Sequence, residues 1–295
     1  MDIEKGAVEI CKAIERAFQR KEGLLIGRNG TVELETVFFK LYSAKPGQDF
    51  PPAIKRRIEI NAGIFPSNKI SLDRWVFSLL EAIRNTDVLV AGWYSPLAIQ
   101  EEVFLDSINT LAPRIPLRSL EPYYVEPSKR WTRLLAGQKV AIVNSFAETA
   151  ASQVKKREEI WTVATESLLP SDVEWIPICT GYSPELAKGR ATWPLDVSSW
   201  DVAVDFTVKR VIKSGAKIAL IGCGGIGMLI GSELKKRGVI AIVMGGATQV
   251  LFGIKGNRWQ THNVISHFWN DAWVYPREDE TPGGAILVEG ACYWK

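Results

Sequence analysis

A glycine-rich turn in the second half of the chain has the spacing used by nucleotide-binding proteins. Its sequence, Gly222-Cys223-Gly224-Gly225-Ile226-Gly227, fits G-x-G-x-x-G and lies between a short aliphatic run and an amphipathic run. Glycines at such a strand–helix turn let a phosphate or ribose approach the backbone N–H groups of a helix start. Glycines that serve only close strand–helix packing are the structural alternative. Because no histidine is near, we interpret Cys223 as filling space and not as a nucleophile.

The same turn lacks the partner that a nicotinamide dinucleotide requires. In that fingerprint an Asp or Glu about 20 residues further on, at the end of the next strand, binds the ribose hydroxyls. Here the next strand ends Val243-Met244-Gly245-Gly246, without a carboxylate. We therefore expect no NAD and retain only the phosphate-binding part of the motif.

The end of the first expected strand combines a cation, a glycine turn and a carboxylate in Arg28-Asn29-Gly30-Thr31-Val32-Glu33. Glu33 would project from the first turn of a helix, where a carboxylate can hold a divalent cation (Mn²⁺ or Mg²⁺) or accept a proton. An acid that only favours the positive end of a helix is the alternative.

Two further strand ends carry candidate binding residues. Ser145-Phe146-Ala147-Glu148 matches a capping box, and the helix start that it caps would face the same cleft. Downstream, Gly245-Gly246-Ala247-Thr248-Gln249 leads to Lys255 and Arg258, with Trp259 alongside. Two cations among glycines suit a diphosphate with a stacking surface beside it, and a basic surface loop is the alternative.

The composition excludes several classes of protein. The 295 residues are 46% hydrophobic and 23% charged, which is typical of a globular chain and not of a disordered or fibrous one. A formal charge of +3 without a strong basic cluster argues against a nucleic-acid surface. Apolar runs of strand length and an N-terminus unlike a secretory signal lead us to expect a cytoplasmic protein without a membrane span. The four cysteines are too widely spaced for a zinc site, and we expect reduced thiols.

Aliphatic segments alternate with amphipathic segments along the chain. Strands buried on both faces predict parallel pairing with helices on both sides, and ligands then bind beyond the carboxyl ends of the strands. We therefore predict an α/β, Rossmann-like, mostly parallel sheet. Four prolines between residues 111 and 131 mark the connection between an N-terminal half (1–130) and a nucleotide-binding half (131–295). The expected strands are 24–26, 87–92, 139–143, 173–178, 217–221 and 239–244, and the expected helices are 7–18, 32–38, 71–84, 146–161, 200–214 and 226–237.

Taken together, these segments resemble the GT-D type glycosyltransferases of bacterial and large-virus polysaccharide pathways. In that family, the strand after the first helix leads to an R-x-G-D-G-E-like turn that binds the nucleotide-sugar and its metal. Arg28, Gly30 and Glu33 line up with its Arg, a Gly and the final Glu, and residues 218–246 look like the family's second strand–glycine loop–helix–strand unit. The resemblance extends from about residue 22 to residue 295 and implies two α/β halves. Residues 61–66, 138–148, 252–259 and 288–294 look like recurring pieces of uncharacterised relatives.

The match departs from the family in the turn itself. Thr31 stands where the family has its first carboxylate, and Val32 stands at the middle glycine, so only Glu33 is carried over. Either metal binding is weaker, Glu35 or another acid substitutes, or cations and helix dipoles neutralise the diphosphate. The cations available for this are Arg28, Lys255 and Arg258.

The resemblance implies a glycosyltransferase that moves a sugar from a UDP-linked donor to a hydroxyl of a glycan acceptor. The departing diphosphate gains negative charge, which backbone and cationic groups would stabilise while a carboxylate takes the acceptor's proton. Glu33 is the first candidate for metal ligand or base, and Asp73 is the second. The residues expected to bind the nucleotide-sugar are Arg28, Gly30, Ser145, Phe146, Gly222, Cys223, Gly224, Gly225, Gly245, Gly246, Gln249, Lys255 and Arg258.

Two other functions stay open. One is an S-adenosylmethionine-dependent methyltransferase, because a strand followed by Gly222-x-Gly224 also receives that cofactor. The other is a nucleotide- or glycan-binding module without catalysis, which the loss of the family's first carboxylate permits.

Overall fold

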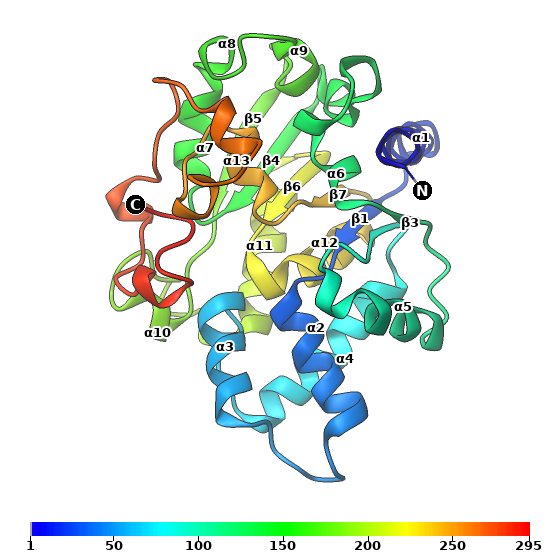
Figure 1. Cartoon of the computed structure of the whole chain (residues 1–295), viewed down its shortest axis with the longest axis vertical. Coiled ribbons are helices and arrows are strands. Elements are labelled where there is room, and N and C mark those ends of the chain that lie inside the picture. Colours follow the sequence, from blue (N-terminus) through cyan, green and yellow to red (C-terminus); the bar gives the residue numbers. More distant parts are fainter. Residues whose placement is uncertain (1) are drawn as a thin grey trace.

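One sheet of seven parallel strands runs through the protein, of which the computed structural model describes residues 2–295 (Figure 1). The strand order is β3-β2-β1-β7-β6-β4-β5, which confirms the predicted α/β, Rossmann-like arrangement. The strands are β1 (Leu24–Arg28), β2 (Val88–Val90), β3 (Arg114–Ile115), β4 (Lys139–Asn144), β5 (Glu174–Cys179), β6 (Ile218–Gly222) and β7 (Ile240–Val243). The helices are α1 (Ile3–Arg20), α2 (Thr31–Phe38), α3 (Pro52–Ala62), α4 (Lys69–Arg84), α5 (Ala98–Ser107), α6 (Leu117–Leu120), α7 (Ala147–Val154), α8 (Arg157–Ile160), α9 (Thr165–Leu168), α10 (Pro184–Ala187), α11 (Trp200–Ser214), α12 (Gly227–Lys235) and α13 (Ala247–Leu251).

The aliphatic strands divide the core into two layers. Successive residues of a strand point to opposite faces, so both faces of a central strand must be covered. In β6, Ala219 and Ile221 belong to one apolar cluster, which is covered by α2, α4, α5, α11 and α12. Ile218 and Leu220 belong to the other cluster, which is covered by α1, α7, α13 and part of the connecting segment.

The two halves of the sequence meet inside this sheet. β1 pairs with β7 in a parallel register that places Leu24 opposite Ile240 and Ile26 opposite Ile242. Because all the strands are parallel, the carboxyl ends of β1, β4, β5, β6 and β7 lie along one edge. The turns that follow these strands are therefore brought together, whichever half they come from.

The structure splits one expected helix and adds several elements. The helix expected over 146–161 is wrong as one element, because α7 ends at Val154 and a separate turn, α8, begins at Arg157. The elements that were not expected are the strand β3 and the helices α3, α5, α6, α9, α10 and α13. In α5, one of the two longer helices among them, Ile99 and Val103 are exposed, so its apolar residues form no single stripe. Within residues 2–295, none of the helices combines the length and the apolar character needed to cross a bilayer.

Candidate functional site

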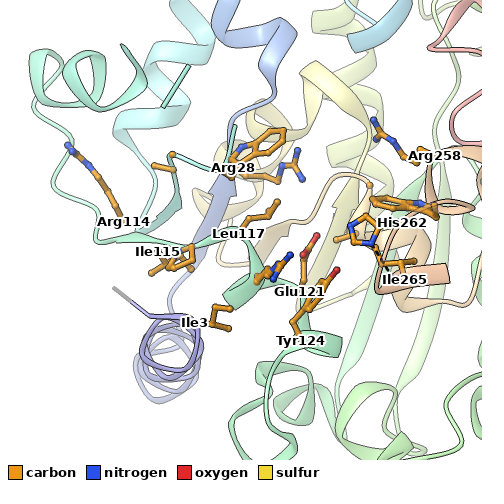
Figure 2. A pocket seen from close by; sticks show the side chains of 18 of the residues that line it. Ile3, Arg28, Arg114, Ile115, Leu117, Glu121, Tyr124, Arg258, His262 and Ile265 are labelled. Atoms are coloured by element: carbon orange, nitrogen blue, oxygen red, sulfur yellow. Dashed lines mark hydrogen bonds between the residues drawn. The ribbon is translucent and has the colours of Figure 1, made fainter. Parts of the chain in front are cut away.

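Two neighbouring cavities lie at the edge of the sheet where the strands end. The large cavity has a volume of about 750 Å³ and lies beyond β1, β2 and β3. The small cavity has a volume of about 220 Å³ and lies beyond β1, β4, β5, β6 and β7. Residues that line both cavities form their common wall, which consists of Arg28, Trp93, Gly246, Arg258 and Tyr293. Figure 2 shows the large cavity, with Arg28 and Arg258 directed into it from different parts of the chain.

Arg28 is the cation at the end of β1. Its guanidinium carbon lies 4.5 Å from the centre of the Trp93 ring, and the Trp93 Nε1–H donates to the Asn29 carbonyl oxygen at 3.1 Å. Gly245 has a φ of +58°, and a Cβ there would lie 3.3 Å from the guanidinium carbon of Arg28. Among residues 2–295, Arg28 has no ion-pair partner. Its stacked, preorganised guanidinium therefore keeps its hydrogen-bond donors for a ligand.

Arg258 reaches the same wall from the C-terminal part of the chain. Its Nη1 donates to the Tyr293 hydroxyl at 2.8 Å, and its Nη2 donates to a carboxylate oxygen of Glu289 at 3.0 Å. Its guanidinium carbon lies 4.6 Å from the centre of the Tyr293 ring. These contacts fix the direction of the side chain, which faces both cavities.

The glycine turn after β6 forms part of the small cavity and also has a packing role. A Cβ on Gly222 would lie 2.6 Å from Asn144 Nδ2 and 2.8 Å from the Gly245 carbonyl oxygen. Gly224 has a φ of +57°, and a Cβ there would lie 2.7 Å from the Ala62 carbonyl oxygen. Close packing therefore accounts for these glycines, while the backbone of residues 222–224 still lines the small cavity.

Glu33 lies over the start of α2 and lines the small cavity. Gly30 is the N-cap of α2, and a Cβ on it would collide with the Glu33 carboxylate, so this carboxylate folds back over the helix start. Burial raises the pKa of the Glu33 carboxyl, although its own backbone N–H and the charge of Arg28 oppose that shift. Glu33 thus lies in the first turn of α2, where its negative charge stabilises the positive end of the helix dipole.

A divalent cation held by protein side chains alone does not fit this donor set. Within residues 2–295, no group of three His, Cys, Asp or Glu side chains is arranged to hold a metal ion. Glu35, the expected substitute, pairs with Arg57 at 2.5 Å. Because Mg²⁺ often binds one or two carboxylates together with substrate phosphates, a metal at Glu33 that depends on a bound diphosphate stays a prediction.

The start of α7 is capped from a distant part of the chain, and the predicted capping box is wrong. The N-cap position carries no side-chain cap, so Ser145 does not play that role. Instead, one carboxylate oxygen of Glu280 accepts the backbone N–H groups of Glu148 at 3.0 Å and of Thr149 at 3.1 Å. The N–H groups that a phosphate would bind at this helix start are thus already occupied.

Asn144, at the end of β4, orders the turn before α7. Its Nδ2 donates to the Gly222 carbonyl oxygen at 2.6 Å, and its Oδ1 accepts the Phe146 N–H at 3.0 Å. Ser145 and Phe146 consequently line the small cavity, as do Gly222, Cys223, Gly224, Gly245 and Gly246.

Two of the expected ionic groups lie away from both cavities. Asp73 pairs with Lys40 at 2.5 Å and with Lys69 at 2.9 Å, which leaves it in an ion-pair cluster at α4. The Lys255 ammonium lies 5.6 Å from the centre of the Trp269 ring. The structure therefore does not bring Asp73 or Lys255 to the residues of the common wall.

Gln249 and Gly225 support the site without lining it. Gln249 is fully buried, and its Nε2 donates to the carbonyl oxygens of Lys255 and Tyr293 at 2.7 Å. Gln249 thereby holds the segment that carries Tyr293. The Gly225 carbonyl oxygen accepts the Nε1–H of Trp75 at 3.1 Å. Burial raises the pKa of the Cys223 thiol to about 12, which leaves it protonated at neutral pH and unsuited to nucleophilic attack.

The segment between the halves forms a wall of the large cavity that sequence reasoning missed. Its residues Arg118, Glu121 and Tyr124 line this space, with the Arg118 guanidinium carbon 4.8 Å from the centre of the Tyr124 ring. Glu121 is only 7% exposed. Burial raises the pKa of its carboxyl to about 7, against the opposing effects of the Arg28 and Arg118 charges and of the Tyr123 hydroxyl. The only sequence signal was a cluster of polar and aromatic residues among prolines, which did not reveal that it crosses the strand ends.

His262 lines the large cavity opposite this segment. Its Nδ1 accepts the backbone N–H groups of Val264 and Ile265, each at 3.2 Å. Burial and the charge of Arg118 lower the pKa of the ring. His262 thus has a hydrogen-bonding role, and a neutral ring with an acceptor Nδ1 carries its proton on Nε2.

Comparison with known proteins gives distant structural similarity. No protein-family model matches the sequence, and no curated protein matches it either. Among solved structures, the chain is similar to one described as the highly conserved domain of unknown function 1792 with a distinct glycosyltransferase fold; the TM-score is 0.43, the identity is 13%, and 84% of this chain and 82% of the other are covered. A selenomethionine-substituted structure of domain of unknown function 1792 matches over the same shares, with a TM-score of 0.42 and 13% identity.

Proposed function

We propose that the protein is a glycosyltransferase that binds the diphosphate of a nucleotide-sugar at the common wall of the two cavities. The observation that carries this proposal is the convergence of Arg28 and Arg258 on that wall, from the end of β1 and from the C-terminal segment. Arginine forks match phosphate oxygens in pairs, and aromatic support at Trp93 and Tyr293 reduces the freedom that binding would remove.

If the diphosphate binds at this wall, sugar transfer develops negative charge next to it. When the bond between the anomeric carbon and the diphosphate breaks, negative charge develops on the leaving phosphate. The two guanidinium groups would stabilise that charge. Phosphate binding in this region also agrees with the strand-end location of ligands in open parallel sheets.

The sizes of the cavities indicate how a donor would be divided between them. The small cavity, with 220 Å³, is below the range of roughly 300–1,000 Å³ typical of pockets that enclose a whole small-molecule ligand. The large cavity, with 750 Å³, falls within that range. A nucleotide-sugar would therefore extend along the residues of the common wall, with one end in the small cavity and the other in the large one. The resemblance of the sequence to GT-D type glycosyltransferases favours UDP as the nucleotide.

Ligand titration tests the proposal. Isothermal titration calorimetry with UDP, UDP-sugars, S-adenosylmethionine and NAD, with and without Mn²⁺, should show binding of UDP-linked ligands. Arg28→Ala and Arg258→Ala should each weaken UDP binding roughly 10- to 150-fold, because each removes charge-assisted hydrogen bonds worth about 1.5–3 kcal/mol. Arg237→Ala is the matched control, since Arg237 is partly exposed and paired with Glu233 at 2.5 Å.

The outcomes separate the three functions. Binding of S-adenosylmethionine but not of UDP would favour a methyltransferase. Binding of UDP-sugars without hydrolysis or transfer, over a panel of glycoside acceptors, would favour a binding module. Equal UDP affinity in wild type, Arg28→Ala and Arg258→Ala would remove the common wall from the proposal.

A further inference from the structure

We propose that Glu121 is the general base of the transfer reaction and that the large cavity receives the acceptor hydroxyl. This inference rests on the proposed glycosyltransferase function and assigns the step that Glu33 and Asp73 were expected to perform. It starts from the position of the Glu121 carboxylate, which is turned into the large cavity on the side opposite His262 (Figure 2).

The surroundings of Glu121 combine burial with access to the large cavity. The residue is only 7% exposed, yet it lines that cavity. Within the protein, the Tyr123 hydroxyl is the hydrogen-bonding neighbour that favours its ionised form. A carboxylate has about four acceptor positions on its two oxygens, so a substrate hydroxyl can donate to Glu121 beside Tyr123. A buried acid at the edge of a cavity with a perturbed pKa is a candidate for a catalytic role.

Charged and titratable groups surround Glu121 on each element that borders it. Arg118 lies on α6, Tyr123 and Tyr124 follow after Pro122, Arg28 ends β1, and His262 and Arg258 also belong to the cavity region. Burial outweighs the cations and the Tyr123 hydroxyl, and it therefore raises the pKa of Glu121 to about 7. A general base works best when its pKa lies near the working pH, and Glu121 meets this condition.

Glu33 is less suited to the same step. Its carboxylate folds over the start of its own helix in the small cavity, where its backbone N–H favours the ionised form. Asp73 is held by two lysines outside both cavities. Of these three acids, Glu121 alone lines the large cavity.

The step balances as a direct displacement. The acceptor oxygen forms a bond to the anomeric carbon while its proton passes to a carboxylate oxygen of Glu121. The bond between the anomeric carbon and the phosphate oxygen breaks, and the nucleoside diphosphate leaves with the electron pair beside Arg28 and Arg258. Attack from the side opposite the leaving group inverts the configuration of the sugar.

Transfer kinetics of Glu121→Gln and Glu121→Asp test this assignment. Wild type is screened with UDP-glucose, UDP-galactose and UDP-N-acetylglucosamine against a panel of p-nitrophenyl glycosides. In wild type kcat/KM should rise with pH through an apparent pKa near 7. Glu121→Gln should lose about 100-fold or more of kcat and should lack this rise, with its affinity for UDP unchanged. Glu121→Asp should keep part of the rate and a shifted pH profile.

Glu22→Gln is the control. Glu22 is exposed and lines neither cavity, so its variant should keep the wild-type rate and pH profile. Transfer by Glu121→Gln within threefold of wild type, an unchanged pH profile, or retention of the donor's anomeric configuration would each overturn the proposal. If wild type neither binds UDP nor transfers a sugar, the proposed function itself fails, and the role of Glu121 fails with it.

Discussion

Replacing Glu121 by Gln should stabilise the protein above neutral pH and leave its stability almost unchanged in acid. The pKa of the Glu121 carboxyl rises from 4.5 to about 7 through burial. Between these pH values the folded chain keeps a proton that the unfolded chain has lost. The free energy of unfolding of wild type therefore falls by about 1.4 kcal/mol per pH unit as the pH rises through this window, and it levels off above it. The total loss is on the order of 3 kcal/mol, and Glu121→Gln does not suffer it.

Urea unfolding followed by tryptophan fluorescence at about pH 5, 6, 7 and 8 measures this difference. The stability of Glu121→Gln minus that of wild type should be near zero at the lowest pH and should grow toward the highest. Glu33 and Glu101 also have raised pKa values, but they titrate in both proteins and cancel in the difference. Glu22→Gln, at an exposed site, should show no such growth. A difference that stays constant with pH would refute the argument that burial perturbs Glu121.

Three further predictions concern packing, capping and thiol reactivity. Gly222→Ala should cost about 1–3 kcal/mol of unfolding free energy, because its Cβ would lie within 3 Å of Asn144 and of the turn Gly245–Thr248. Gly246→Ala, whose nearest neighbours would lie at 3.5 Å or more, should change stability little and weaken UDP binding; equal melting temperatures of the two variants would contradict this. Glu280→Ala leaves two backbone N–H groups of α7 unpaired and should lower the free energy of unfolding in urea by about 1–3 kcal/mol. Glu278→Ala, at an exposed site, is the control, and an equal loss in that variant would show that Glu280 does not cap α7. Burial raises the pKa of all four thiols. After treatment with iodoacetamide at about pH 8, intact-mass analysis should therefore find almost no adducts on the native protein and four adducts on the protein unfolded in urea. Rapid labelling of Cys223 in the native protein would show that its thiol is not shielded.

Local patterns in the sequence were sufficient for the central elements of the fold. α11 has the predicted bounds, because apolar residues recur at helical spacing from Trp200 and because Gly215, with a φ of +74°, ends the helix in the left-handed conformation. The aliphatic strands likewise predicted a parallel sheet, since only burial on both faces suits them. In both cases the decisive information lies within about 15 residues of chain.

Long-range contacts explain what the sequence left undetermined. The N-cap of α7 was assigned to Ser145 from local spacing, but Glu280 performs this role from 132 residues away. Asp73 and Lys255 had suitable chemistry and lie elsewhere, because a residue type does not indicate which wall of a cavity its element forms. Arg28, Glu33 and Arg258 were predicted at the site and line the small cavity. Arg28 and Glu33 end β1 and begin α2, elements whose place in the sheet could be inferred, whereas Arg258 was chosen for its charge among glycines.

The two buried acids beside Arg28 show how structural and functional carboxylates can be distinguished. Glu101 is 2% exposed, and burial raises its pKa, yet it accepts hydrogen bonds from Asn29 Nδ2 at 3.1 Å and from the Gly92 N–H at 2.9 Å. These bonds tie the end of β1 to the loop after β2 and so hold Arg28 against Trp93. Glu121 has the Tyr123 hydroxyl as a neighbour, but burial outweighs its effect, and the charged form of Glu121 lowers the stability of the fold. The bonds of Glu101 serve the fold without any ligand, whereas Glu121 lines the large cavity, where a group that enters can give it a proton.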